Sequence, residues 1–497
     1  MDDIWFVKDF NGVQKGTKDN PFSPKTAQEY DAQFASLQFD ADGWHVRNRV
    51  IRYGPGEFLT WGCYEFGDFA TKDRPRIGPS WQVLLSPDTV ISLDPNLPDS
   101  YIGNWPLRVY TSASQWQQYL WWGREQEWID LTPEQLWAGL SECQLVKGGT
   151  INLNFEALAQ RWMTTGWRCC LSAGLLQGHG PAWEDVHVTN FGTHKPTGPD
   201  GKPFGPSAEN FPLSLAGAVD GYDRNKLAKL DPTKYIFSAH LPDEKCPHHT
   251  GCSFSNYNEI ESNDQISCHT ITGSIGQPTV HPLSAGDETS PFVNHYHKYA
   301  YQQNNKVDLP ETHALRNLVQ GFTIYNTLRG DVSKNLTRNC QAFYYSDFFQ
   351  AKAVDVHDNE ALRTLRGACW FLSDGGPDSE HFSSVDHKFR RNKVTFVGMD
   401  VDYHGGVFLW NIDRKPPSPD RYLGRITIGG EGEENDFSFD GPPGTGNIAI
   451  HAINADRVTI GFNKYGDKLR EIVLTNCTNV TRPSLWQRFV YWLKRVV

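Results

Sequence analysis

The sequence predicts one long all-β solenoid of the parallel β-helix type, preceded by a helical cap and followed by an amphipathic helix. Three units in the last third of the chain each have the pattern strand, asparagine, strand, aspartate. Their asparagines Asn335, Asn359 and Asn392 stand 24 and 33 residues apart. The 44 glycines and 30 prolines indicate many turns. Units too short to bury a core alone must stack on one another, which is the logic of a solenoid.

The asparagines of these units have a physical reason to stand at bends. A tight bend between two strands needs left-handed backbone angles, which asparagine tolerates while it hydrogen-bonds to its neighbours. We therefore expect Asn335, Asn359 and Asn392 to adopt that conformation. Asp347 and Asp374 end successive units. Turn chemistry and a shared groove explain their position equally well.

Residues 1–50 are expected to form an N-terminal cap. Ser23-Pro24 is typical of a helix start, with serine as the N-cap and proline at the first helical position. Four apolar residues follow at helical spacing: Ala27, Tyr30, Phe34 and Leu37. A helix of this kind covers the open end of a sheet stack, whose backbone groups would otherwise stay unpaired.

The β-helix is expected over residues 51–480. Short strand patterns separated by turn residues recur along it, for example at 81–86 and 89–93. Two polar ranges, about 193–250 and 277–312, are expected to be loop insertions. Loops of such length inside a domain are often functional.

The last residues, 481–497, predict a C-terminal helix. Ser484-Leu-Trp-Gln487 has the capping-box pattern. An apolar stripe follows at helical spacing: Leu485, Phe489, Trp492, Leu493 and Val496. Two interpretations stay open. The helix either covers the last turn of the solenoid or lies on a membrane or partner surface.

Composition and charge narrow the function classes. A net charge of −11 disfavours a nucleic-acid partner, which normally needs a broad basic surface. No run of about 18 apolar residues predicts a transmembrane helix. Met1 to Phe10 does not have the pattern of a signal peptide. Ten scattered cysteines do not form the framework of a small disulfide-rich domain. The 17 tryptophans suit either a wide β core or a carbohydrate site.

Four segments carry a resemblance to a known family: Gly16–Phe22, Tyr53–Thr60, Glu184–Gly192 and Phe343–Asp347. On these, together with the asparagine-bearing units, the chain resembles the right-handed parallel β-helix proteins of the pectate-lyase-like superfamily. More narrowly, it is similar to a group of bacterial β-helix proteins of unassigned function. The resemblance covers most of residues 10–480. It implies a right-handed solenoid, and relatives that include polysaccharide lyases, hydrolases, epimerases, phage tailspikes and non-catalytic surface proteins.

Two clusters are candidates for polysaccharide cleavage. Asp386, Lys388 and Arg390 share one face if the segment is a strand. They would present an acid and two bases to an anionic sugar, as a β-eliminating lyase requires. The alternative is an ordinary solvated face.

The second cluster is Asp400, Asp402 and His404, also at alternate positions. Two carboxylates and an imidazole suit general acid–base catalysis or a metal site. A polar face beside a turn is the alternative.

A compact group in the first insertion is a weaker candidate for a metal site. Cys246, His248, His249 and Cys252 offer four ligands of the kind that zinc prefers. Their spacing matches no zinc finger that we recognise, and adjacent histidines rarely bind one ion. Any cofactor is therefore unknown, with a divalent metal as the hypothesis.

The leading hypothesis is a carbohydrate-active β-helix protein that binds a polysaccharide and cleaves it as a lyase or glycoside hydrolase. The alternative is a non-catalytic structural or adhesive β-helix, or a tailspike-like oligomer. Clustered ionisable groups with facing aromatic rings in a groove would favour the first. A carbohydrate-active role would place the protein in the periplasm or outside the cell. The sequence leaves substrate, bond type, compartment and oligomeric state open.

Overall fold

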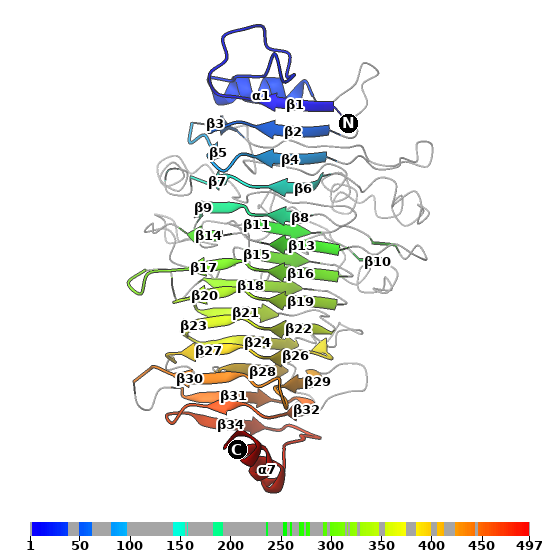
Figure 1. Ribbon diagram of the computed structural model, residues 1–497, viewed down its shortest axis with the longest axis vertical. Helices are drawn as coiled ribbons and strands as arrows, with labels where there is room; N and C mark the ends of the chain where they lie inside the picture. The colour runs from blue at the N-terminus through cyan, green and yellow to red at the C-terminus, as the bar shows by residue number, and fades with distance from the viewer. Residues whose placement is uncertain are drawn as a thin grey trace, which may run out of the picture. The chain divides into compact units, whose positions relative to one another are not determined.

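The computed structural model describes residues 2–37, 49–61, 81–96, 143–154, 157, 182–191, 235–236, 252–255, 259–260, 268–272, 275–278, 292–295, 299–313, 316, 319–325, 329–346, 353–373, 384–398, 405–411, 423–442 and 446–496. Within them the chain is a right-handed parallel β-helix, which confirms the predicted fold (Figure 1). It divides into unit 1, Met1–Tyr299 with His313–Val319, and unit 2, Ala300–Thr312 with Gln320–Val497.

Unit 1 contains three parallel sheets. Sheet 1 has the order β1 (Asp2–Phe6), β2 (Arg49–Tyr53), β4 (Trp81–Leu85), β6 (Cys143–Lys147), β8 (Ala182–Glu184) and β13 (Cys268–Thr272). Sheet 2 has β3 (Gly56–Thr60), β5 (Thr89–Leu93), β7 (Thr150–Asn152), β9 (His187–Phe191) and β14 (Ile275–Pro278). Sheet 3 has β11 (Cys252–Ser255) and β15 (Phe292–His295), and a separate antiparallel pair joins β10 (Tyr235–Ile236) to β12 (Glu259–Ile260).

Unit 2 repeats the three-sheet plan. Sheet 1 has β16 (Tyr299–Gln303), β19 (Arg329–Ser333), β22 (Val354–His357), β26 (Lys388–Arg390), β29 (Leu423–Ile428) and β32 (Asp456–Ile460), with β25 (Ser384–Val385) beside β29. Sheet 2 has β17 (Lys306–Asp308), β20 (Leu336–Arg338), β23 (Glu360–Thr364), β27 (Lys393–Phe396), β30 (Asp436–Phe439) and β33 (Lys464–Tyr465). Sheet 3 has β18 (Gln320–Tyr325), β21 (Ala342–Ser346), β24 (Gly367–Ser373), β28 (Val407–Asn411), β31 (Ile448–Ile453) and β34 (Arg470–Thr475). The chain therefore visits sheets 1, 2 and 3 in order and then begins the next turn.

Strand alternation places the core of unit 2 inside the turns. Successive side chains of a strand point to opposite faces, so every second residue is buried. In sheet 1, Val332, Val356 and Phe389 occupy the same register position on neighbouring strands and are fully buried. In sheet 2, Phe437 packs against the ring of Phe389 at 6.2 Å between centroids. The apolar half of each strand thus forms one continuous core.

Sheet 3 of unit 2 differs because both of its faces are buried along β28. The ring of Phe371 stacks on the buried His387 at 4.7 Å, so Phe371 and its register partner Leu409 face the core. Phe408 points the other way and is nevertheless fully buried. In sheets 1 and 2, by contrast, strands such as β22 and β27 alternate buried with more accessible residues. The described polar surface of unit 2 therefore lies mainly on sheets 1 and 2.

A ladder of buried asparagine side chains lies between sheets 1 and 2 of unit 2. It comprises Asn305, Asn335, Asn359, Asn392, Asn435 and Asn463. From Asn335 onward, each amide Oδ1 accepts hydrogen bonds from the backbone N–H and the Nδ2 of the asparagine one turn earlier, as Asn359 does from Asn335 at 2.9 and 3.2 Å. The Nδ2 of Asn359 also donates to the carbonyl of Val332 at 2.7 Å. The ladder therefore ties each turn to the next.

The predicted left-handed conformation belongs to other residues. It is adopted by the residue before four of the six ladder asparagines, namely Asn304, Lys334, Asp358 and Arg391, whose φ angles are 57°, 57°, 55° and 52°. The asparagines themselves have no positive φ. Their side chains must instead point into the stack to reach the next turn. The prediction about Asn335, Asn359 and Asn392 was therefore wrong in conformation, although these residues do mark the bends.

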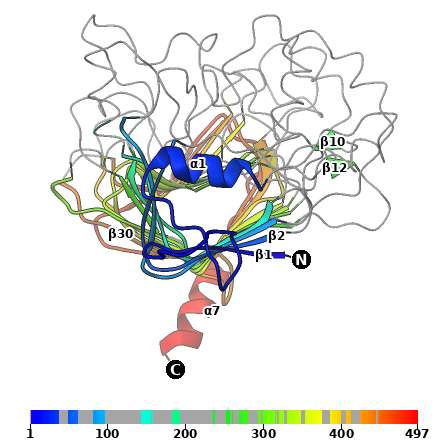
Figure 2. The same cartoon turned by 90° about the horizontal axis from the view of Figure 1, so that it is seen from above.

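Helix α1 (Ala27–Ala35) lies across the first strands of unit 1 (Figure 2). It begins four residues after the predicted N-cap Ser23: Thr26 is the N-cap, and its hydroxyl accepts a hydrogen bond from the Glu29 backbone N–H at 3.1 Å. Ser23 instead donates to the Lys8 carbonyl at 2.6 Å. Tyr30 and Phe34 are fully buried. The helix therefore covers the apolar end of the stack.

Helix α7 (Leu485–Val496) follows β34 and has the predicted capping box. The Gln487 backbone N–H donates to the Ser484 hydroxyl at 3.2 Å, and the Ser484 backbone N–H donates to the Gln487 side chain at 2.8 Å. Neither α1 nor α7 combines the length and apolar character that a membrane-crossing helix needs, and this holds for the described residues alone.

The two expected insertions are described to different extents. Of residues 193–250, only β10 falls within the described ranges. The range 277–312 contains β15, β16 and β17, so it supplies strands of the solenoid as well as connections. The domain boundaries proposed from the sequence stay predictions.

Substituting Asn359→Ala should lower the free energy of unfolding by about 3 kcal/mol, because the buried Val332 carbonyl and Asn335 N–H would each lose a partner. Urea denaturation followed by tryptophan fluorescence measures the change. Asn463→Ala is the matched control, since Asn463 is half-buried at the end of the described ladder and water can replace its bonds. Equal losses in the two variants would contradict the ladder's role.

Candidate functional site

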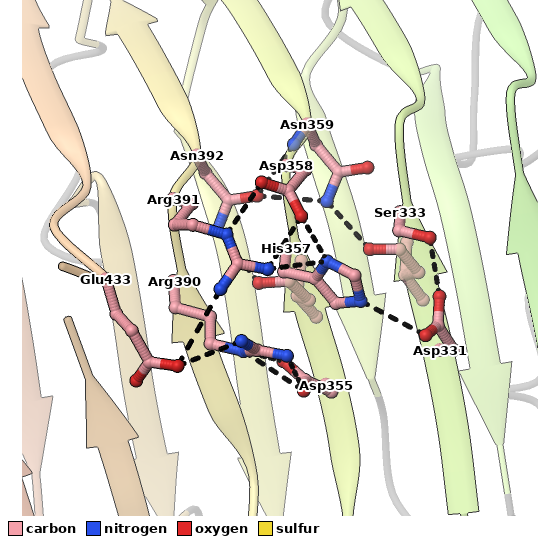
Figure 3. A network of polar contacts seen from close by, with 12 residues as sticks. Asp331, Ser333, Asp355, His357, Asp358, Asn359, Arg390, Arg391, Asn392 and Glu433 are labelled. Carbon is pink, nitrogen blue, oxygen red and sulfur yellow. Dashed lines mark hydrogen bonds and ion pairs between the residues drawn. The ribbon is translucent and has the colours of Figure 1, made fainter. Parts of the chain in front are cut away.

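The outward face of sheet 1 in unit 2 carries a cluster of ionisable side chains. Asp331 on β19 is the register partner of Asp355 on β22, and Asp355 is the partner of Lys388 on β26. Two residues further along the same strands, His357 is the partner of Arg390. Neighbouring strands lie about 4.8 Å apart. These side chains therefore stand side by side on one face, as Figure 3 shows for most of them.

His357 lies between two carboxylates. Its Nε2 is 3.1 Å from Asp331 Oδ2, and its Nδ1 is 2.6 Å from Asp358 Oδ2. The hydrogen bond to Asp331 is the largest influence on the ring and raises the pKa of His357, against the opposing effect of burial. Asp358 and the charge of Asp355 add to the increase. The arrangement favours a protonated imidazole that donates from both nitrogens.

Asp331 is held by neighbours from two strands. Its Oδ1 accepts hydrogen bonds from the Ser333 hydroxyl at 2.6 Å and from Gln303 Nε2 at 3.1 Å. Burial alone would raise the pKa of Asp331. The hydrogen bonds from His357, Ser333 and Gln303 outweigh it and lower the pKa. Asp331 is therefore a fixed carboxylate at neutral pH.

Arg391 pairs with Asp358 across one turn of the solenoid. Its Nε and Nη2 donate to the two carboxylate oxygens at 2.8 and 2.7 Å, a bidentate geometry. Those hydrogen bonds hold the pKa of Asp358 well below its usual range. Both residues adopt the left-handed conformation at bends that precede ladder asparagines. The turn geometry therefore places this pair beside the sheet.

Arg390 is saturated by two carboxylates. It donates to Asp355 through Nε at 3.0 and 3.1 Å and through Nη2 at 2.7 Å, and its Nη1 donates to Glu433 at 2.9 Å. The hydrogen bond to Asp355 raises the pKa of the guanidinium above its already high value. Arg390 is therefore unsuited to accept a proton, which bears on its predicted role as a lyase base.

The first predicted cluster has the expected alternation. Asp386 and Lys388 are exposed and Arg390 is partly exposed, whereas His387 and Phe389 are buried. Asp386 stands before β26 in a left-handed conformation, with its carboxylate 2.6 Å from Arg425. Lys388 makes no ion pair within the described part of the chain. The catalytic role of the three residues stays a prediction.

The other candidates cannot be placed. Asp400, Asp402 and His404 lie outside the described residues, as do Cys246, His248 and His249. Cys252 begins β11, and its side chain is not described. Across the described ranges, no three His, Cys, Asp or Glu side chains gather closely enough to hold a metal ion. Both sites stay predictions.

Sequence reasoning missed most of the network. The segment from Val354 to Asn359 shows Asp355 and His357 at alternate positions, which could have indicated an outward polar face. Asp331 and Glu433 had no such signal, because they meet the others only through the register of turns 24 to 43 residues apart.

Two carboxylates of the network, Asp331 and Asp358, are unsuited to act as a general acid. A hydrolase needs one carboxyl group that keeps its proton, usually through a raised pKa. Asp331 and Asp358 have lowered pKa values, and Arg390 is locked in ion pairs. What remains is a rigid set of planar carboxylate and guanidinium groups, with the Lys388 ammonium beside them.

No protein-family model matches the sequence. A search of curated proteins finds no match either. Among solved structures, the chain is similar to a tailspike protein double mutant of the E. coli bacteriophage HK620, at 9% identity and a TM-score of 0.46, over 95% of this chain and 66% of that one. This chain therefore spans slightly less than two thirds of that tailspike's length.

Two other solved structures are similar at 9% identity. One is the Streptococcus pneumoniae surface protein and adhesin PfbA, with a TM-score of 0.32 over 92% of this chain and 94% of that one. The other is a hyperthermoactive exopolygalacturonase from Thermotoga maritima, with a TM-score of 0.28 over 91% and 88%. At such scores these likenesses carry no argument about function, and the fold rests on the strand pairing.

The network makes stability depend on pH in a defined direction. Because the folded pKa of His357 is raised, its contribution is complete below its ordinary value of about 6.5 and disappears as pH rises through the raised value. Thermal unfolding midpoints measured from about pH 6 to pH 9 should therefore fall more steeply for the native protein than for His357→Gln. Parallel slopes for the two proteins would contradict the assignment.

Proposed function

We propose that the outward face of sheet 1 in unit 2 binds a polysaccharide that carries acidic groups. The observation that supports this most is the rigid network beside Lys388. Fixed carboxylates and guanidinium planes can exchange hydrogen bonds with pairs of sugar hydroxyls, and groups already held in place lose little entropy on binding. Because parallel strands repeat at a regular spacing, such a face suits a polymer better than a single small molecule.

Lys388 is the residue that would favour an acidic polysaccharide over a neutral one. It is exposed between Asp355 on one neighbouring strand and Thr427 on the other, and it makes no ion pair within the described residues. Arg390 and Arg391, by contrast, are neutralised by Asp355, Asp358 and Glu433. The ammonium of Lys388 therefore supplies the charge that a uronic-acid carboxylate would meet.

The protein would go further than binding if it also cleaved the polysaccharide. A lyase would need Lys388 as its base, since Arg390 is held in ion pairs. A hydrolase would depend on Asp400 and Asp402. In either form, a role on polysaccharides would place the protein outside the cytoplasm or in the periplasm. A non-catalytic adhesive or tailspike-like oligomer would use the same face for binding alone.

Lys388→Ala should weaken binding of polygalacturonate by tenfold to about a hundredfold, the loss of one charge-assisted hydrogen bond worth about 1.5–3 kcal/mol. Isothermal titration calorimetry of the full chain measures it. A neutral polymer such as dextran should bind weakly and equally to both proteins. Assaying the same mixtures for unsaturated product and for reducing ends separates a lyase, a hydrolase and a binding protein.

Lys393→Ala is the matched control. Lys393 is an exposed lysine of the same turn, one strand later on sheet 2, and its removal changes the net charge equally. Equal weakening by both substitutions would indicate non-specific attraction. Absence of binding by the native protein across acidic polysaccharides would overturn the proposal.

A further inference from the structure

Helix α7 is a basic helix on an acidic protein. Its sequence, LWQRFVYWLKRV, contains three basic residues and no aspartate or glutamate, whereas the whole chain has a net charge of −11. Arg482 stands just before it and is exposed. Figure 1 places the helix beyond β34 at the end of unit 2, and Figure 2 shows it projecting away from the sheets of that unit.

One side of α7 is fastened to unit 2. The ring of Tyr491 stacks on Phe462 with 4.0 Å between centroids, and its hydroxyl donates a hydrogen bond to Glu434. Lys494 forms an ion pair with Glu431 at 2.7 Å. These contacts hold the helix against the segment between β29 and β30 and against Phe462, which lies between β32 and β33, and they fix which side turns outward.

The opposite side of α7 is an exposed apolar stripe. With 3.6 residues per turn, Leu485, Trp486, Phe489 and Leu493 lie within about one third of the helix circumference, roughly opposite Tyr491. These side chains are 85%, 70%, 47% and 38% exposed. Among the described residues, they account for all but one of the large apolar side chains that are exposed. The interpretation in which α7 buries its predicted stripe on the solenoid is therefore wrong for Leu485, Phe489 and Leu493, whereas the side chains of Trp492 and Val496 are not described.

We propose that this stripe binds the surface of an anionic lipid bilayer, with α7 lying in the interface and without crossing it. Aromatic and leucine side chains on one face and basic residues on its flanks are the features of interfacial helices. Arg482 and Arg488 would meet the negative lipid headgroups. A second copy of the chain fits less well, since pairing two such stripes would bring basic flanks together without an acidic residue on either helix.

The test is sedimentation of the full chain with large unilamellar vesicles. Vesicles of phosphatidylcholine and phosphatidylglycerol in equal amounts should pellet the protein, and vesicles of phosphatidylcholine alone should pellet much less. Binding should also fall as salt is raised, because the charge component is screened. Equal binding to neutral and anionic vesicles, or to neither, would overturn the proposal.

Leu485→Asp is the informative variant. It removes an apolar group from the stripe, and an acidic residue in the first helical turn stabilises a helix, so the helix itself should persist. Vesicle binding should weaken by tenfold or more. The control is Val13→Asp, which changes the same charge at an apolar side chain that is 68% exposed and lies in unit 1.

The control should bind vesicles like the native protein. Equal losses in Leu485→Asp and Val13→Asp would mean that net charge alone governs binding, which would contradict the role of the stripe. Analytical ultracentrifugation without lipid identifies the competing occupant. A concentration-dependent dimer that Leu485→Asp abolishes would assign the stripe to a second copy and overturn the lipid proposal.

Discussion

The ladder of buried asparagine amides holds the turns of unit 2 in register, and the described surface of that unit depends on this register. Asparagines inside the ladder, such as Asn359 and Asn392, use both the carbonyl oxygen and the Nδ2 of the side-chain amide in hydrogen bonds to neighbouring turns. Because strand side chains alternate, a slip of one residue would turn His357 inward and Val356 outward. It would also leave buried amides without hydrogen-bond partners, at a cost of about 1–3 kcal/mol each. The ladder therefore fixes which side chains reach solvent.

The charged network is a consequence of the same bends. Asp358 and Arg391 immediately precede ladder asparagines and adopt left-handed backbone angles with φ of 55° and 52°. Such angles cost a non-glycine residue about 1 kcal/mol or more. At each of these two bends, the asparagine amide points into the stack, and the charged side chain before it points outward and contacts the charged side chain of the neighbouring turn. The buried ladder and the exposed bidentate pair are thus two sides of one turn geometry.

The sequence predicted a stacked repeat, its bends at Asn335, Asn359 and Asn392, and the capping box of α7, because each has a local signature. It predicted two strands for each unit, whereas each turn of unit 2 has three. It did not predict which bend residue takes the left-handed angle, since the ladder's demand on the asparagine side chain appears only when turns are stacked. Ion-pair partners such as Asp355 and Arg390 were missed for a related reason: 35 residues separate them, and only register brings them together. The exposure of Leu485 likewise depends on where Tyr491 docks, which no helical pattern reveals.

The ion pairs also cross turns in a way that bears on how unit 2 would respond to mechanical load. Hydrogen bonds between parallel strands of successive turns run along the stack, so tension in that direction would open a plain solenoid one turn at a time. Asp331, His357, Arg391 and Glu433 come from four consecutive turns. His357 contacts Asp331 and shares the Asp358 carboxylate with Arg391, and Arg391 also pairs with Glu433. Pulling one of these turns away strains the contacts of the next. These four turns should therefore unfold together under load, and the weakest contacts between turns should lie on either side of them.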